Sequence, residues 1–320
     1  MNSQVFYCRL SFVKRATRSL QLVALALGML LLFAACAGPF GSAPAPLSGH
    51  IGVDGSTALQ PLVSKAATLF QQTYPQVHID VKGGGSLTGL KDVTTRKVDI
   101  GDSDIYADPA TYPDPNLTDH LVCVIPFTMI ASSDVPITNL TQAELVDIFT
   151  TGKYTNWDQL HGPNLRIVPI VRPSTSGTRA TFRKYVLGGR DELSNLVTID
   201  SSQNVVKTVA QTPGAIGYLA ASVLDPQVHA LSIDGYTDTL PNIEAGHYSF
   251  WSYEHMYTLT DNGLLDAFLN FMLTSQVQQQ AFALHYIPTS DLKFPQLSSN
   301  TPAAALSAPY ALVERQRYRS

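Results

Sequence analysis

The sequence predicts an α/β protein built from two lobes. Strand patterns and helix patterns alternate along the chain from about residue 49, which is typical of α/β sheets. The chain has 320 residues, of which 45% are hydrophobic and 14% are charged, so it can bury a sizeable core and divide into two parts of ordinary domain size. A long extended run at residues 121–132 predicts a connection that crosses from one lobe into the other.

The first half of the pattern contains three strands, at residues 50–54, 78–82 and 98–101. Apolar residues recur at helical spacing from Leu59 to Phe70, so residues 55–57 form a turn between a strand and a helix. The loop Gly83–Ser86 precedes a second helix. Asp102–Asp104 follows the end of the third strand, where open α/β sheets place ligands.

The second half repeats this alternation. Thr141 and Glu144 have capping-box spacing and open a short helix that runs through Phe149. A loop at 173–178 lies between a predicted strand and a predicted helix, and Pro213 with Gly214 marks a turn before another strand. The expected strands and helices are 167–172, 179–187, 215–219, 249–259, 264–273 and 276–284.

The extended segment 249–259 is expected to return to the first lobe. These patterns place lobe I at residues 49–130 and 250–294 and lobe II at residues 131–249. Residues 295–320 are rich in Ala, Ser and Pro and end in basic residues, which predicts a loose C-terminal tail.

The N-terminal residues 1–35 predict a lipoprotein signal peptide. Basic residues precede an apolar run that ends at Ala35, a run too short for a comfortable membrane span. Leu32–Cys36 resembles a bacterial lipobox, in which Cys36 becomes the lipidated first residue of the mature protein. Phe33 stands where relatives more often carry Leu, and an uncleaved anchor helix is the alternative. Residues 36–48 predict a flexible tether, and the chain beyond them is expected outside the cell membrane.

Charge and cysteine content exclude two classes of protein. The formal net charge of the chain is −4, and residues 1–35 carry basic but no acidic residues, so the mature part is more acidic still. A nucleic-acid partner is therefore not expected, because it would require a basic surface. Cys123 is the only cysteine left outside the N-terminal segment, which excludes an intramolecular disulfide and favours a buried thiol.

Turns rich in Gly, Ser and Thr carry the functional signal. A helix N-terminus offers unpaired backbone N–H groups and a partial positive charge, which suit a small anion. The turn from Arg172 to Arg179 adds a permanent cation and several hydroxyl donors, as tetrahedral oxyanion recognition requires. Any one such turn is also explained by helix capping alone.

Several segments together resemble the phosphate-binding proteins of bacterial phosphate ABC importers. The matching segments are Gly55–Pro61, Gly83–Ser86, Val98–Asp104, Phe149–Lys153, Asn156–Trp157, Ser176–Arg179, Pro213–Tyr218 and Tyr286–Pro288. The resemblance implies a type II periplasmic-binding-protein fold, with a mixed β-sheet flanked by helices in each lobe and the ligand in the cleft between lobes. It implies a monomer that delivers inorganic phosphate to ABC permease subunits without a cofactor or a metal.

The resemblance also implies the residues that contact phosphate. They are Ser56, Thr57, Ala58, Ser86, Asp104, Arg172, Ser176, Gly177 and Thr178. Ser174 occupies a position where some relatives have an acidic residue paired to the arginine, so the geometry of Arg172 departs from their pattern. Asp104 favours phosphate over sulfate, because a carboxylate accepts the proton that phosphate carries and sulfate lacks. A role for Asp104 as a turn cap or as the partner of Arg172 is the alternative.

Other functions remain open at this point. A binding protein for sulfate, molybdate or tungstate would use similar donors, and a surface adhesion or sensing lipoprotein would bind no small anion. A phosphatase is disfavoured, because neither Ser86 nor Ser176 lies in a Gly-x-Ser-x-Gly turn. The eight histidines show no metal-binding spacing, and Gly83–Gly89 does not complete a nucleotide-binding loop.

Overall fold

The computed structural model describes residues 47–260 and 262–292, which belong to one compact unit. The predicted signal peptide, Cys36, nearly all of the tether and the C-terminal tail lie outside the described residues. No helix among the described residues has both the length and the apolar character needed to cross a membrane.

Strands and helices follow the order that the sequence predicts, with additional short elements in the second half. The strands are β1 (Gly49–Gly55), β2 (Val77–Val81), β3 (Ile100–Ser103), β4 (Thr118–Ser132), β5 (Asn139–Leu140), β6 (Val168–Val171), β7 (Val197–Thr198), β8 (Ala215–Ala220), β9 (Val228–Ile233) and β10 (Trp251–Thr258). The α-helices are α2 (Gln60–Thr73), α3 (Ser86–Thr94), α4 (Gln142–Val146), α5 (Gly177–Tyr185), α6 (Ser202–Gln211), α7 (Leu240–Glu244), α8 (Gly263–Met272) and α9 (Ser275–Ala283).

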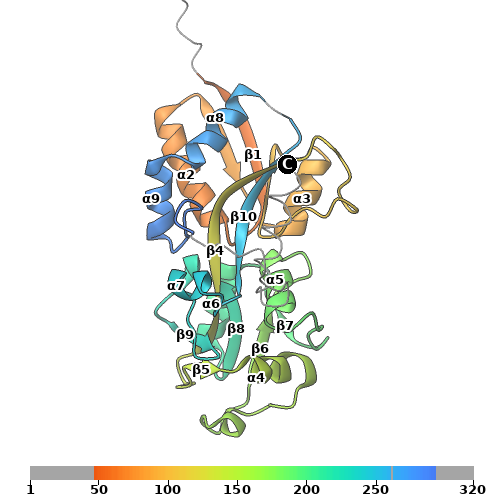
Figure 1. Cartoon of the computed structure of the whole chain (residues 1–320), viewed down its shortest axis with the longest axis vertical. Coiled ribbons are helices and arrows are strands. Elements are labelled where there is room, and N and C mark those ends of the chain that lie inside the picture. Colours follow the sequence, from red (N-terminus) through yellow and green to blue (C-terminus); the bar gives the residue numbers. More distant parts are fainter. Residues whose placement is uncertain (1–46, 261, 293–320) are drawn as a thin grey trace, which may run out of the picture. The chain divides into compact units, whose positions relative to one another are not determined.

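The mixed α/β fold class is confirmed. Parallel strands β2, β1 and β3 are extended by antiparallel β10 and β4, and β4 then pairs with β8 and β9. Figure 1 shows α2, α8 and α9 on one side of the first group of strands and α3 on the other. In the second group, α6 packs its apolar residues Val205 and Val209 against β8, while Phe182 of α5 stacks on Tyr218 with ring centroids 4.1 Å apart.

The long strand β4 links the two groups of strands, as the extended run predicts. Its residues up to Pro126 pair with β10, and from Phe127 onward they pair with β8. The change of partner at Pro126 and Phe127 lies a few residues before the expected lobe boundary at 130. Figure 1 shows β4 and β10 running side by side between the two groups, and these strands connect the two lobes.

Local capping rules explain several helix ends. Thr141 and Glu144 form the predicted capping box at α4, with the Thr141 hydroxyl accepting from the Glu144 amide. A π-helical turn at Asp147–Thr151 extends this helix to Gly152, where φ is 67°. One expectation is corrected: Asp102 and Ser103 lie inside β3, and only Asp104 follows it, because β3 pairs through these residues with both β1 and β10.

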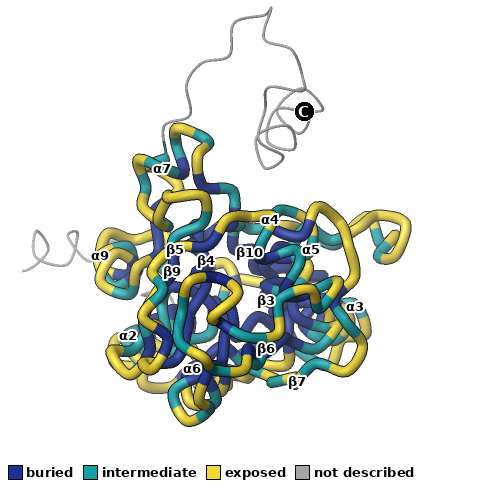
Figure 2. The backbone as a smooth tube through the Cα atoms, turned by 90° about the horizontal axis from the view of Figure 1, so that it is seen from below, coloured by how far each residue is buried: buried dark blue, intermediate teal, exposed yellow. Residues whose placement is uncertain are grey.

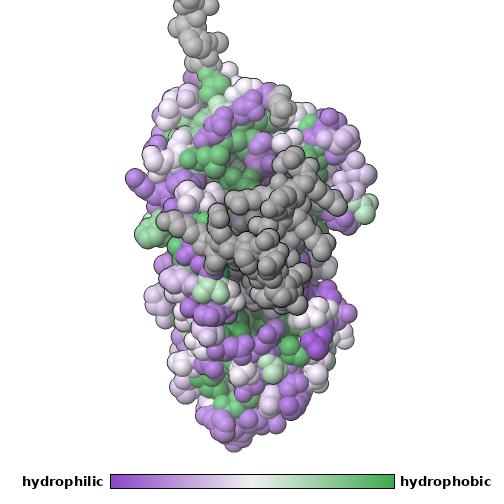
Figure 3. Space-filling model, in the orientation of Figure 1, coloured by the Kyte–Doolittle hydropathy of each residue, from purple (hydrophilic) through white to green (hydrophobic). Residues whose placement is uncertain are grey.

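The core is largely apolar, and the exposed surface mixes polar and apolar residues. Figure 2 shows buried backbone concentrated along the central strands and exposed backbone on the outer helices and loops. In Figure 3, hydrophilic and hydrophobic residues are interspersed over the visible face of the described residues. Phe282 on α9 and Leu273 after α8 are the large apolar residues with the highest exposed fractions among them, at 74% and 53%.

Helix α3 packs so closely on the sheet that it tolerates only glycine at one position. A Cβ atom on Gly89 would lie 2.6 Å from the carbonyl oxygen of Asp102 and 2.7 Å from that of Asp54. The backbone of α3 therefore rests directly on β1 and β3, which fixes Ser86 at the start of the helix relative to Asp104 beyond the end of the strand.

We expect Gly89→Ala to destabilise the protein by about 2 kcal/mol, because backbone atoms must move to admit the methyl group. Gly263→Ala in the first turn of α8 is the matched control. A Cβ there meets no atom within 4 Å, so alanine should be neutral or slightly stabilising. Urea unfolding of both variants measures the difference, and equal stabilities would show that α3 can move away from the sheet.

Candidate functional site

The predicted site residues lie at five places, three at helix starts and two after strand ends. Ser56–Ala58 connects β1 to α2, Ser86 begins α3, Asp104 follows β3, and Ser176–Thr178 begins α5. Arg172 follows β6. The structure brings all of these side chains into buried positions, and each of Thr57, Ser86, Asp104 and Arg172 exposes 3% or less of its surface.

Ser86, Asp104 and Gly177 come together although they are distant in the sequence. The backbone amide of Asp104 donates to Ser86 Oγ at 2.9 Å. A Cβ on Gly177 would approach Asp104 Cβ to 2.8 Å and would overlap Ser86, so only glycine permits this approach of α5 to α3. The amide of Leu87 also donates to the carbonyl oxygen of Thr175 at 3.0 Å. The two lobes are therefore in direct contact at this site.

Only one of the two carboxylate oxygens of Asp104 accepts a hydrogen bond from the described residues. Its Oδ2 accepts from Thr178 Oγ1 at 2.8 Å, across the two lobes. Its Oδ1 is buried and has no hydrogen-bond partner among the described residues. The carbonyl oxygen of Asp104 accepts from Ser252 Oγ, which fixes the backbone against β10. Asp104 thus presents one free, desolvated acceptor.

The guanidinium of Arg172 is held by neutral oxygen atoms. Nε donates to the carbonyl of Ile199 at 3.1 Å, Nη1 to Ser202 Oγ at 3.1 Å, and Nη2 to Thr57 Oγ1 and the carbonyl of Asp200, both at 2.9 Å. Burial lowers the pKa of Arg172, while the charge of Asp104 acts in the opposite direction. Within the described chain, no carboxylate oxygen accepts a hydrogen bond from the Arg172 guanidinium, so its charge remains available to an anion.

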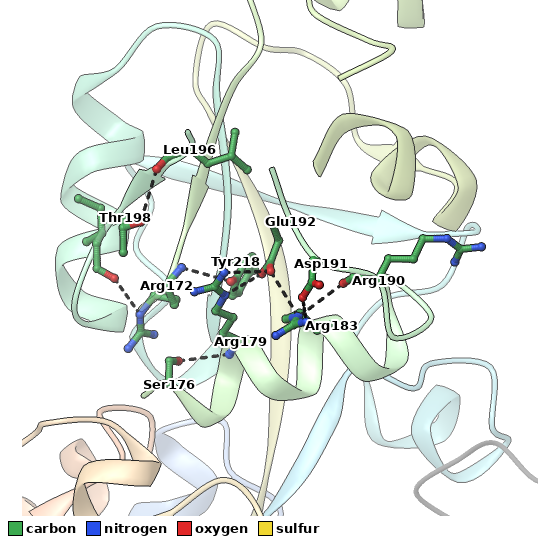
Figure 4. Close-up of polar contacts among 11 residues, drawn as sticks. Arg172, Ser176, Arg179, Arg183, Arg190, Asp191, Glu192, Leu196, Thr198 and Tyr218 are labelled. Atoms are coloured by element: carbon green, nitrogen blue, oxygen red, sulfur yellow. Dashed lines mark hydrogen bonds and ion pairs between the residues drawn. The ribbon is translucent and has the colours of Figure 1, made fainter. Parts of the chain in front are cut away.

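Two acidic residues of lobe II lie near these groups. The charge of Asp200 acts on Arg172 and lies beside the carbonyl that accepts from its Nη2, whereas Glu192 pairs with other arginines. Glu192 accepts from Arg179 Nε at 3.0 Å and from Arg179 Nη2 at 3.1 Å, and it also pairs with Arg183. Figure 4 shows this group along α5, separate from the Arg172 guanidinium. Glu192 therefore does not replace the acidic partner that some relatives have at the position of Ser174. The backbone amide of Arg172 donates to the Tyr218 hydroxyl at 3.2 Å, which fixes the backbone at this point.

The starts of α2 and α5 differ in which backbone amides remain without an acceptor. Ser56 Oγ accepts from the amides of Ala58 and Leu59, both at 3.0 Å, so the Ala58 amide already has a partner. Ser176 Oγ accepts from the Arg179 amide at 3.2 Å. The amides of Gly177 and Thr178 are the first two of α5 and have no acceptor within the helix. The start of α5 therefore offers donors, with the positive end of the helix dipole behind them.

Sequence reasoning missed the groups that support these residues. Ser202 and the carbonyls of Ile199 and Asp200 hold Arg172, and Ser201 caps α6 beside them. The Ser201–Ser202 pair before an apolar helical pattern was the available signal. Glu254 was also missed, and its signal was an acidic residue inside a strand pattern that is otherwise buried.

Comparison with known proteins identifies the family of the chain. A family model for the PBP superfamily domain matches residues 41–276. The phosphate-binding protein PstS of Bacillus subtilis is 42% identical over 250 residues, which cover 77% of this chain and 83% of the relative. PstS of Borreliella burgdorferi is 22% identical over 72% of this chain and 88% of the relative.

Solved structures give the same result. A putative phosphate ABC transporter substrate-binding protein from Clostridium perfringens, solved with bound phosphate, superposes with a TM-score of 0.71 and 26% identity over 75% of this chain and all of that one. An ABC-type phosphate transport receptor from Vibrio cholerae shares the fold, with a TM-score of 0.61 and 22% identity over 74% of this chain and 99% of that one. The resemblance that the motifs predict is confirmed, and the chain belongs to the PBP superfamily and, within it, to the family of phosphate-binding proteins named PstS.

Proposed function

We propose that this chain captures inorganic phosphate outside the cell membrane and delivers it to an ABC-type importer. One observation carries the proposal: among residues 47–260 and 262–292, a buried arginine that donates to no carboxylate lies in the same site as a carboxylate oxygen that has no donor. The arginine supplies charge to the anion, and the free oxygen supplies an acceptor for a proton on that anion. Membership in the PstS family supports the same ligand.

The contacts follow from the chemistry of each group. Arg172 and the hydroxyls of Thr57 and Ser86 donate to phosphate oxygens, as do the amides at the start of α5. The Thr178 hydroxyl donates to Asp104 Oδ2, so Thr178 contributes to phosphate through its backbone amide. Asp104 Oδ1 accepts the phosphate proton. Ser56 supports the turn, and Ser176 caps α5, so both contribute mainly through the backbone. Each phosphate oxygen exchanges hydrogen bonds to water for hydrogen bonds to fixed donors of the protein. These hydrogen bonds are stronger in a buried site, where the local dielectric constant is low.

Capture requires the lobes to separate. The site residues are almost fully buried, and Arg172 reaches across the lobes to Thr57. Opening about β4 and β10, where sheet partners change near Pro126 and Phe127, would expose the donors. Phosphate binds groups from both lobes and so favours the closed form, which the permease would recognise. The protein acts as a monomer without enzymatic activity, tethered to the membrane through lipid on Cys36.

Isothermal titration of the purified full chain with phosphate, sulfate and molybdate tests the function. We expect saturable phosphate binding and affinities at least tenfold weaker for the other two anions, because a protonless oxyanion leaves Asp104 unpaired and repelled. If sulfate or molybdate bound more tightly than phosphate, that anion and not phosphate would be the ligand. Release of phosphate from a phosphate ester would contradict a role limited to binding.

Asp104→Asn should reduce this selectivity. The amide can donate to an unprotonated oxyanion, so we expect phosphate affinity to fall about tenfold and sulfate affinity to rise. Asp266→Asn on the exposed side of α8 removes the same charge far from the site and serves as the control. Unchanged selectivity in Asp104→Asn would place the anion elsewhere.

Cys36→Ala should abolish membrane attachment. Without the thiol, the lipid cannot be added, and the protein should no longer incorporate a radiolabelled fatty acid. Membrane and soluble fractions of expressing cells measure its distribution. Fatty-acid labelling that persists in the variant would exclude Cys36 as the lipidated residue, and phosphate binding by both forms controls for folding.

A further inference from the structure

Two buried carboxyl groups lie beside Asp104 without a role in the contacts described so far. Asp102 and Glu254 are completely buried. None of their four carboxyl oxygens has a hydrogen bond of good geometry within residues 47–260 and 262–292. The described part of the chain has no group of three His, Cys, Asp or Glu side chains arranged to hold a metal ion, so these carboxyl groups are not a cation site of that kind.

Strand register places Glu254 next to Asp104. In the antiparallel pair of β3 and β10, His255 faces Ser103 and Met256 faces Asp102. Continuing this register by one residue sets Glu254 opposite Asp104, and the bond from Ser252 Oγ to the Asp104 carbonyl holds the strands together there. Residues two apart on a strand point to the same face, so all three carboxyl groups share one side of the sheet.

The surroundings cannot support three negative charges. Burial raises the pKa of Glu254 well above its ordinary value, and Asp104 and Asp102 raise it further. Burial likewise raises the pKa of Asp102, with Asp54 and Asp104 adding to the effect. Arg172 is the cation that interacts with this group, through Asp104. Arg172 therefore balances the charge of Asp104, and burial favours the neutral form of the other two carboxyl groups.

The other titratable side chains near Glu254 come from several elements. His255, the next residue on β10, points to the opposite face of the sheet, where its Nδ1 lies 2.8 Å from Asp119 Oδ1. Cys123 on β4 and Tyr286 after α9 face Glu254, and burial raises the pKa of both, so both are neutral near pH 7. On the opposite side of the sheet, α3 carries Lys91 and Asp92, whose opposite charges offset one another.

We propose that Glu254 is an uncharged positioning residue, whose carboxyl proton is shared with Asp104 and holds that carboxylate as the acceptor for phosphate. A neutral carboxylic acid is a hydrogen-bond donor, and Asp104 is the side chain that hydrogen-bonds with Glu254. A carboxylate has about four lone-pair sites, so Asp104 can accept from Thr178 and Glu254 and still accept the phosphate proton at Oδ1. Glu254 thus fixes the carboxylate without adding a second negative charge beside the anion. This role rests on the proposed function, since it assumes that Asp104 receives the phosphate proton.

The experiment compares three substitutions by phosphate titration at pH 7. Glu254→Gln keeps an N–H donor without charge, so its phosphate Kd should stay within about threefold of the parent. Glu254→Met keeps the length of the side chain but removes the donor, and its Kd should rise at least about tenfold. Asp102→Asn is the matched control on the same face, with a Kd within about threefold of the parent, since it leaves the contact between Glu254 and Asp104 intact.

A second measurement reports the proton without any ligand. The folded chain keeps a proton on Glu254 that the unfolded chain loses above an ordinary glutamate pKa, so stability falls as pH rises between the two values. Each such proton makes the unfolding equilibrium constant rise about tenfold per pH unit in that range. In Glu254→Gln this contribution is absent. Between about pH 5.5 and 8, the unfolding equilibrium constant of the variant, measured with urea, should therefore rise with pH about tenfold less per pH unit than that of the parent.

The outcomes separate the two proposals. A parent protein that binds no phosphate would overturn both the proposed function and the positioning role. A parent that binds phosphate, together with a Glu254→Met variant that binds it equally well, would overturn the positioning role alone. If Glu254→Gln had the same pH dependence of unfolding as the parent, or bound phosphate much more tightly, Glu254 would be charged in the parent. Either result would also overturn the positioning role.

Discussion

A buried guanidinium must receive from the protein the hydrogen bonds that water would otherwise supply, and this requirement shapes the site. Arg172 meets it with two backbone carbonyls from the segment before α6, one hydroxyl at the start of α6 and one hydroxyl from lobe I. Two separate segments, residues 199–202 and the turn at Thr57, must therefore converge on one side chain. Because Thr57 supplies the lobe I contact, the same requirement couples lobe closure to the solvation of the arginine.

The local features of the site were predictable because they depend on neighbouring residues. Gly, Ser and Thr between a strand pattern and a helix pattern predict a helix start with free amides, and Ser176 caps α5 in that way. The alternation of strands and helices likewise predicted the fold class. The long run at 121–132 predicted the strand that links the lobes, since few other arrangements accommodate so long a buried strand.

The supporting contacts were not predictable, because they depend on register and on groups that every residue carries. A carbonyl oxygen at Ile199 has no signature in the sequence, so its bond to Arg172 emerges only when the chain is folded. The place of Glu254 depends on how β10 pairs with β3, and a shift by one residue would turn its side chain to the opposite face. The end of β3 was misplaced for a related reason, since pairing on both sides extends the strand through Asp102.

The charge balance of the site explains why it would favour an oxyanion that carries a proton over one that does not. In the proposed assignment Arg172 is positive and Asp104 negative, while Asp102 and Glu254 keep their protons because burial raises the pKa of both, so these four side chains carry no net charge. Long-range attraction then contributes little, and hydrogen bonds must supply most of the binding free energy. Under that condition one mismatched pair matters greatly, because a free acceptor facing an oxyanion without a proton costs its own desolvation and meets a like charge. A more positive site would bind anions more generally and discriminate among them less.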